Sequence, residues 1–162
     1  MKTILIFVHK FHHYYFGFNC LLYTIYVILP VGGIVKVLSI KEPYASLIKD
    51  GYKCYETRSF KTNYRGELYI HASLSKCNQS DKLSKLITPM YGEIICKCML
   101  VDCIYMTDEF IENLKKNNEV EYKCGLYEVG RYAWVLENVL AIKPIKAKGK
   151  LGIWNFEYEK SK

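Results

Sequence analysis

The sequence lacks the ligand spacings of a structural metal site. It has seven cysteines, an odd number, and no C-x-x-C pair. His71 is the only histidine after residue 34, so the usual cysteine and histidine spacing of zinc sites is missing. Cys96 and Cys98 lie two residues apart in an apolar run, which is typical of small buried side chains. We therefore expect reduced thiols, a cytoplasmic-type compartment, no metal and no cofactor.

Common catalytic and phosphate-binding motifs are also missing. The sequence has no serine–histidine–aspartate elbow, no phosphate-cradling glycine loop and no paired-carboxylate motif. It contains no internal repeat, low-complexity tract or long linker. A chain of 162 residues without such features predicts one domain with a sizeable core.

Acidic residues are absent from positions 1–34, where Lys2 and Lys10 are the only formal charges. Residues 11–35 carry no charge and are long enough for a membrane anchor. In a second interpretation, residues 1–34 are an apolar extension produced by an upstream start site, because the globular pattern begins abruptly at Val35. A third makes them part of the core. We expect residues 35–162 to be the working domain, with a membrane as partner only if residues 1–34 are native.

Positive charge is in excess over the whole chain. Lysine and arginine total 23 against 16 acidic residues, which gives a formal net charge of +7. This balance indicates attraction to anions such as nucleic acid or acidic lipid, although lysine-rich surfaces also serve solubility. A hydrophobic fraction of 51%, with 15% aromatic residues, is typical of a globular protein.

Apolar periodicity predicts an α+β domain in which strands dominate. The predicted strands cover residues 35–40, 53–58, 67–73, 93–106 (bulged near Asp102), 131–143 and the end of 149–158. The predicted helices cover residues 43–50, 78–88 and 108–117, the last capped by Thr107. In strand 67–73 the alternation points Leu68, Ile70 and Ala72 inward, and His71 and Ser73 outward. We expect a curved sheet or small β-barrel with flanking short helices.

The segment 51-GYKCYETRSF-60 gathers Lys53, Glu56 and Arg58 within six positions. On a strand, Glu56 and Arg58 share one face, and Lys53 takes the other unless the turn at Gly51 redirects it. Such an arginine can grip a phosphate or a base edge, and a partly buried lysine beside a carboxylate can act as nucleophile or proton carrier. A salt bridge at a strand edge explains the same spacing.

Three further features have both a functional and an ordinary explanation. Arg65 offers a second phosphate contact, or is solvated. His71 is a general base, or a satisfied surface histidine. The four lysines of 143-KPIKAKGK-150 line nucleic acid, or form a solvated loop.

Several ordered blocks carry a resemblance to a known family. They are 39-SIKEPYASLIKDGYKCYETRSF-60, 64-YRGELYIHAS-73, 92-GEIICKCMLVDC-103 and the later R-Y-A-W-V-L and K-G-K-L-G-I-W runs. Through these blocks, residues 36–156 resemble the ASCH domain family (activating-signal-cointegrator homology), which is related to PUA-like RNA-binding folds. Its signature looks like G-x-K-x-x-E-x-R, here Gly51, Lys53, Glu56 and Arg58. The resemblance implies a β-barrel with flanking helices and a cleft near the signature that receives RNA or a nucleobase.

The same resemblance implies two kinds of activity. Some small bacterial members are amidohydrolases that deacetylate acetylcytidine, with a lysine at the position of Lys53, a threonine three residues later and a glutamate further along. A ribonuclease activity is attributed to other members. This chain has Glu56 in place of that threonine, and it looks closer to the eukaryotic coactivator branch, whose domain binds nucleic acid.

We expect a module that binds RNA or another single-stranded nucleic acid. The alternative is an enzyme acting on modified nucleosides or RNA, with Lys53 as nucleophile or base and Glu56 as proton shuttle. A small adaptor domain without a ligand is the third hypothesis. The expected ligand-binding residues are Tyr44, Lys53, Glu56, Arg58, Ser59, Arg65, His71 and Ser73.

Overall fold

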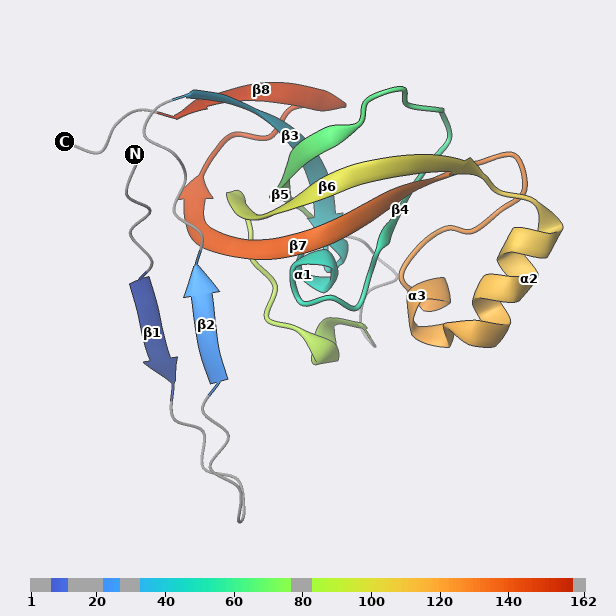
Figure 1. Cartoon of the computed structure of the whole chain (residues 1–162), viewed down its shortest axis with the longest axis horizontal. Coiled ribbons are helices and arrows are strands. Elements are labelled where there is room, and N and C mark those ends of the chain that lie inside the picture. The colour runs from blue at the N-terminus through green and yellow to red at the C-terminus, as the bar shows by residue number, and fades with distance from the viewer. Residues whose placement is uncertain (1–6, 12–21, 27–32, 77–82, 159–162) are drawn as a thin grey trace, which may run out of the picture.

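The main body of the protein is one six-stranded mixed sheet. The computed structural model describes residues 7–11, 22–26, 33–76 and 83–158. The sheet has the order β4-β7-β6-β5-β3-β8 (Figure 1). Its strands are β3 (Gly33–Glu42), β4 (Tyr55–Arg58), β5 (Gly66–Lys76), β6 (Glu93–Tyr105), β7 (Tyr132–Lys146) and β8 (Ile153–Tyr158). β3 and β5 pair in parallel, and the other neighbours in this sheet pair antiparallel.

The long strands β6 and β7 curve, and α1 (Tyr44–Lys49) lies beneath them (Figure 1). The register of β6 against β7 shifts between Leu100 and Asp102, where the sequence predicted a bulge. Apolar side chains of α1 and the sheet, including Ile48 and Trp134, form the main core. This arrangement confirms the expected curved sheet with short helices. β4 and β8 remain its two edges, so the sheet is not closed into a full barrel.

The second face of β5 is buried, which contradicts the predicted outward position of His71. Tyr69 and His71 are each 1% exposed, because the β7–β8 connection lies against His71 and Trp154 of β8 packs with Tyr69. Tyr69 packs with Val37 and Trp154 in a second apolar cluster. The alternation of residues in β5 predicted one buried and one solvated face. In the structure, this strand lies inside a sheet that is covered on both faces, so both of its faces are buried.

The helices confirm one prediction and correct another. α2 (Asp108–Asn117) begins at Thr107, whose hydroxyl accepts a hydrogen bond from the Phe110 backbone N–H at 3.2 Å. The helix predicted over residues 78–88 is a 3-10 helix, η1 (Leu83–Leu86), while residues 78–82 lie outside the described residues. Leu86 of this turn is 47% exposed. The short helix α3 (Glu119–Lys123) was not predicted.

The described N-terminal residues form a second, smaller sheet. β1 (Phe7–Phe11) and β2 (Leu22–Tyr26) pair as an antiparallel two-stranded sheet (Figure 1). Within the described ranges, no helix has the length and apolar character needed to cross a membrane. β3 begins at Gly33, two residues before the predicted domain start, and Gly33 and Ile34 pair with β8. Most of the anchor predicted over residues 11–35 lies outside the described residues.

Candidate functional site

A cleft of about 880 Å³ lies where the curved sheet stays open, between β4 and β3. Arg58 reaches across it, because its Nη2 donates to the Ser39 carbonyl of β3 at 3.3 Å. The walls come from β3, β4, β5, the chain after α3 and the β7–β8 connection. A second hollow, on α2, is lined only by exposed side chains, so we place the candidate site in the cleft between β3 and β4.

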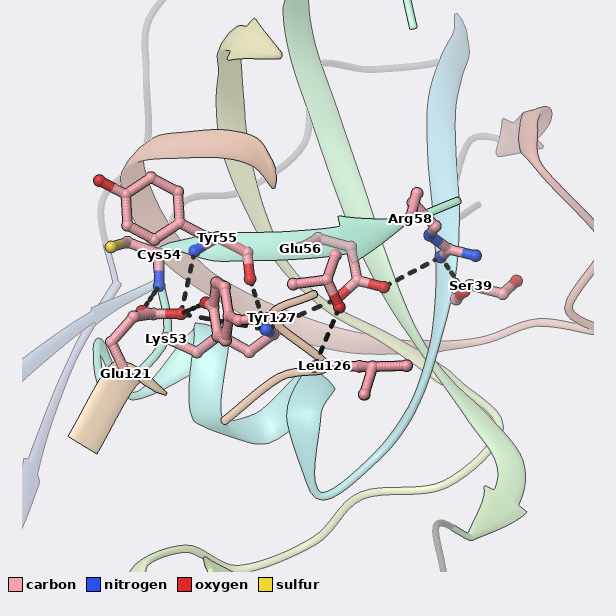
Figure 2. Close-up of polar contacts among 10 residues, drawn as sticks. Ser39, Lys53, Cys54, Tyr55, Glu56, Arg58, Glu121, Leu126 and Tyr127 are labelled. Carbon is pink, nitrogen blue, oxygen red and sulfur yellow. Dashed lines mark hydrogen bonds and ion pairs between the residues drawn. The ribbon is translucent and has the colours of Figure 1, made fainter. Parts of the chain in front are cut away.

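Lys53 occupies the buried end of the cleft. After α1 the chain turns at Gly51 (φ +80°), and the backbone N–H groups of Tyr52 and Lys53 both donate to the Leu47 carbonyl. Lys53 therefore precedes β4 and is redirected toward the side of Glu56, which was the alternative left open by the sequence. Its side chain is only 1% exposed, and its ammonium donates to the Tyr55 carbonyl (Figure 2).

Two carboxylates flank this ammonium. The Nζ of Lys53 lies 3.9 Å from Glu56 Oε2 and 4.0 Å from Glu121 Oε1 (Figure 2). The ring centroid of Tyr44 is 5.6 Å from the same nitrogen, within cation–π range. A lysine held between two carboxylates and an aromatic ring keeps its charge compensated despite burial.

Glu121 was missed by the sequence analysis. It is fully buried and accepts hydrogen bonds from the backbone N–H groups of Cys54 (2.5 Å) and Tyr55 (3.4 Å), and from the Tyr127 hydroxyl. Asn118 caps α3 by accepting from the Glu121 N–H at 3.0 Å, so the N-x-x-E spacing was a readable helix-start signal. That signal predicts a helix, but the contact of the carboxylate with β4 is set by tertiary packing.

Glu56 and Arg58 share one side of β4, as the strand period predicted. Arg58 Nη2 lies 3.2 Å from Glu56 Oε1, and the guanidinium lies 5.8 Å from the centroid of the Trp134 ring. We call Lys53, Glu56, Arg58 and Glu121 the floor of the cleft. It holds two cations and two carboxylates, so its formal charges cancel.

The cysteines near the floor are poor nucleophiles. Burial, together with the nearby Glu121 carboxylate, raises the pKa of Cys54 to about 12 and that of Cys124 to about 11. Both thiols are therefore protonated near neutral pH, and thiolate chemistry is disfavoured here. Cys124 lines the cleft as an uncharged surface.

His71 lines the other side of the cleft. Its Nε2 lies 3.0 Å from the Ala147 carbonyl, which can only accept, so Nε2 carries a hydrogen. Burial lowers the pKa of His71, which favours the neutral ring with a lone pair on Nδ1. Gly149 packs against this edge, since a Cβ there would lie 2.9 Å from Nδ1. His71 is thus a buried, neutral histidine rather than a solvated one.

The structure gathers most of the predicted ligand-binding residues but not all. Those lining the cleft are Tyr44, Lys53, Glu56, Arg58, His71 and Ser73. Ser59 is exposed just after β4 and is not part of the lining. Arg65 is also outside it, and pairs instead with Asp102 at 3.0 Å and with the carbonyls of Thr62 and Tyr64.

Four further basic residues line the cleft. We call Lys41, Arg131, Lys148 and Lys150 the wall. Lys148 and Lys150 come from the 143–150 lysine run, whereas Lys41 and Arg131 had no distinguishing signal in the sequence. Lys150 lies over the Trp154 ring, with its Nζ 5.7 Å from the centroid. No carboxylate of the described residues forms an ion pair with the wall.

The lining also includes three exposed apolar side chains. Leu74 is 78% exposed, Leu126 49% and Leu151 99%. Three buried nitrogens of lining residues have no hydrogen-bond partner within the described ranges: Arg58 Nε, Arg131 Nε and His71 Nδ1. Because buried polar atoms are normally paired, three unpaired nitrogens at one cleft are an unusual concentration of unsatisfied polar groups.

Comparisons with known proteins give one family. No curated protein matches the sequence. The solved structures similar to it include ASCH from Zymomonas mobilis, with 17% identity, a TM-score of 0.46, and coverage of 68% of this chain and 72% of that one. A tyrosine-to-phenylalanine mutant of that protein gives 19% identity, a TM-score of 0.44 and coverage of 68% and 74%. A serine-to-alanine mutant gives 20% identity, a TM-score of 0.45, and coverage of 68% of this chain and 72% of that one.

The family itself is identified from the sequence match. The model of the ASCH domain matches residues 38–146, which is more than half of the chain. The matched range contains the Lys53, Glu56 and Arg58 signature, the rest of the floor, and Lys41 and Arg131 of the wall. The chain belongs to the ASCH domain family.

Proposed function

We propose that the cleft between β3 and β4 binds RNA or another single-stranded nucleic acid. The observation that carries this proposal is the charge of the lining. It contains one carboxylate, Glu56, and six basic side chains: Lys41, Lys53, Arg58, Arg131, Lys148 and Lys150. Since Glu56 and the buried Glu121 balance Lys53 and Arg58, the excess positive charge is that of the wall. A concave surface with this excess attracts a polyanion and raises its association rate.

Apolar groups at the cleft fit the rest of a nucleotide. Tyr44 presents an aromatic ring in the lining, and stacking of a base on such a ring contributes about 1–3 kcal/mol. Leu74, Leu126 and Leu151 offer exposed apolar contacts for bases or sugars. A paired duplex would hide its base faces from these side chains, so we favour a single strand.

A salt-titrated binding measurement tests the proposal. We expect the affinity for fluorescently labelled single-stranded RNA to fall linearly on a log–log plot against salt. Arg58→Ala removes a charged donor from the cleft and is expected to weaken binding about tenfold or more. Arg65→Ala removes the same charge outside the cleft and is the matched control. Wild type and Arg58→Ala binding RNA equally weakly would refute the proposal.

An enzyme acting on modified nucleosides or RNA is the second candidate. The observation that favours it is the buried Lys53 ammonium between the Glu56 and Glu121 carboxylates. A lysine in this position can exchange a proton with either carboxylate and then act as a base or nucleophile. Glu121 is a buried carboxylate on the C-terminal side of the signature. The hydrolases that the sequence resembles carry a glutamate further along the chain, and we propose Glu121 as a candidate for that role.

Turnover separates the two candidates. Acetylcytidine and RNA are incubated with wild type, Lys53→Ala and Glu121→Gln, and products are followed by chromatography. An enzyme of this kind would lose turnover in Lys53→Ala, while Arg65→Ala would retain it. Intact substrates with wild-type protein would leave binding as the function of the cleft.

A further inference from the structure

Among the cleft cations without a partner in the described residues, Lys41 and Lys148 are exposed, whereas Arg131 is half-buried. Its backbone is fixed just before β7, since its N–H donates to the Glu128 carbonyl (3.3 Å) and its carbonyl accepts from Met106 N–H (2.9 Å). Its side chain is half-buried and lines the cleft. The Nε is buried without a partner, and no ion pair or hydrogen bond of the guanidinium occurs within the described ranges.

The other two arginines, one in the cleft and one at the surface, both have side-chain partners. Arg58 has Glu56 and the Ser39 carbonyl as partners, and Arg65 has Asp102 and two loop carbonyls. Arg131 has none of these among the residues that the structure describes. Leaving a partly buried guanidinium unpaired is unfavourable, so its complement is expected to arrive with the ligand.

The guanidinium of Arg131 indicates which chemical group of a ligand would pair with it. A guanidinium presents its N–H donors in coplanar pairs, and such a pair matches two oxygens of one phosphate. Lys41 and Lys148, also without ion-pair partners in the described part of the chain, add charge to the same cleft. A bare nucleoside offers no anion to this wall, whereas every nucleotide of RNA does.

We propose that Arg131 binds a phosphate group of the ligand, so the cleft selects a nucleotide over the corresponding free nucleoside. This inference rests on the proposed nucleic-acid function and deepens it by naming the ligand class. The floor then contacts the nucleoside part, and Arg131 with the neighbouring lysines contacts the phosphate. The phosphate is either a terminal monoester or a backbone diester.

Calorimetric titration with three probes tests the inference: cytidine, cytidine 5′-monophosphate and a cytidine hexanucleotide without terminal phosphates. For wild type we expect the monophosphate to bind about tenfold tighter than cytidine, as a charged bidentate contact implies. In Arg131→Gln this advantage is expected to fall below about threefold. Tight hexanucleotide binding identifies a diester, and tight binding of the monophosphate alone identifies a monoester.

Two variants serve as controls. Arg65→Gln removes an equal charge from an arginine outside the cleft and is expected to keep the wild-type advantage. Arg131→Lys keeps the charge but loses the paired donors, so we expect an intermediate advantage. Thermal unfolding of each variant shows that it is folded. If Arg131→Gln does not fold, the wild-type probe series and Arg131→Lys decide the question.

Two results would overturn the proposed contact between Arg131 and a phosphate. Equal binding of cytidine and its monophosphate to wild type would overturn the phosphate contact. Equal losses in Arg131→Gln and Arg65→Gln would reduce the effect to overall charge and also overturn it. If cytidine monophosphate binds in an Arg131-dependent way but the hexanucleotide does not bind at all, the nucleic-acid function fails while the phosphate contact stands.

Discussion

The floor and the wall of the cleft differ in whether their charged side chains have ion-pair partners. In the floor, Lys53 is almost fully buried, and its ammonium has the Glu56 and Glu121 carboxylates on either side. In the wall, Lys41, Arg131 and Lys148 have no ion-pair partner among the described residues. The charges of the floor are therefore paired within the protein, whereas Lys41, Arg131 and Lys148 of the wall have charges that a ligand can pair.

This difference separates stability from binding. A buried ion pair is costly to break, because the remaining charge stays in a poorly solvated site. An exposed lysine contributes little to folding, since water already solvates it. Substitutions in the floor should thus change the free energy of unfolding, and substitutions in the wall should change affinity and its salt dependence.

The largest expected effect is at Glu121. Glu121→Ala leaves Lys53 with one carboxylate fewer and removes the acceptor of the Cys54 and Tyr55 backbone N–H groups. We expect the free energy of unfolding to fall by about 3–5 kcal/mol, measured by urea denaturation. Glu119→Ala is the matched control on α3, because Glu119 is exposed and pairs only with Lys123. Similar losses in both variants would show that the floor is not a special network.

The wall should control the salt dependence of binding. Lys41→Gln combined with Lys148→Gln removes two cleft lysines. Since each phosphate contact contributes about 0.7 to the log–log salt slope for a single strand, we expect the slope for RNA to fall by about 1.4. Fluorescence anisotropy at several salt concentrations measures it. The control, Lys36→Gln with Lys116→Gln, removes equal charge outside the cleft. An unchanged slope in the cleft variant would place the phosphates elsewhere.

His71 adds a smaller, pH-dependent effect on the wall side. Burial lowers the pKa of His71 in the folded state, while the unfolded chain keeps a value of about 6.5. The unfolded state therefore takes up the proton first, and stability decreases as the pH falls below about 6.5 toward the folded-state pKa. His71→Gln keeps an amide donor for the Ala147 carbonyl and should remove this component. Urea denaturation of wild type and His71→Gln at pH 7.5 and pH 5.5 gives the loss of stability of each protein on acidification. Equal losses in the two proteins would contradict the assignment of this component to His71.

The sequence predicted the six strands of the main sheet and α2 well because their signals are local, whereas it did not predict β1 and β2. Thr107 as a cap and the alternation of residues 67–73 need no knowledge of distant segments. The signature around Lys53 was also local, and the redirection of Lys53 at Gly51 was one of two stated options. The ASCH resemblance over residues 36–156 agrees with the matched range 38–146.

The missed features depend on tertiary packing. Glu121 lies 68 positions after Lys53, and only the docking of α3 on β4 brings the two side chains together. The burial of His71 depends on β8 and the chain before it, which cover a face that alternation alone marks as solvated. Arg65 and Arg131 look alike in sequence, each next to a tyrosine. Only the position of Asp102 shows which arginine already has a partner.

The smallest expected effect concerns Leu151, which tests whether the cleft binds its ligand through charge alone. Its side chain is 99% exposed and lines the cleft, so Leu151→Ser should change the free energy of unfolding by no more than about 0.5 kcal/mol. If bases or sugars of a bound strand pack on it, affinity for single-stranded RNA should fall roughly threefold, or about 0.7 kcal/mol, with an unchanged salt slope. Val129→Ser, at a position 53% exposed and outside the cleft lining, is the control. Equal affinities of the two variants and wild type would show that Leu151 makes no apolar contact with the bound strand.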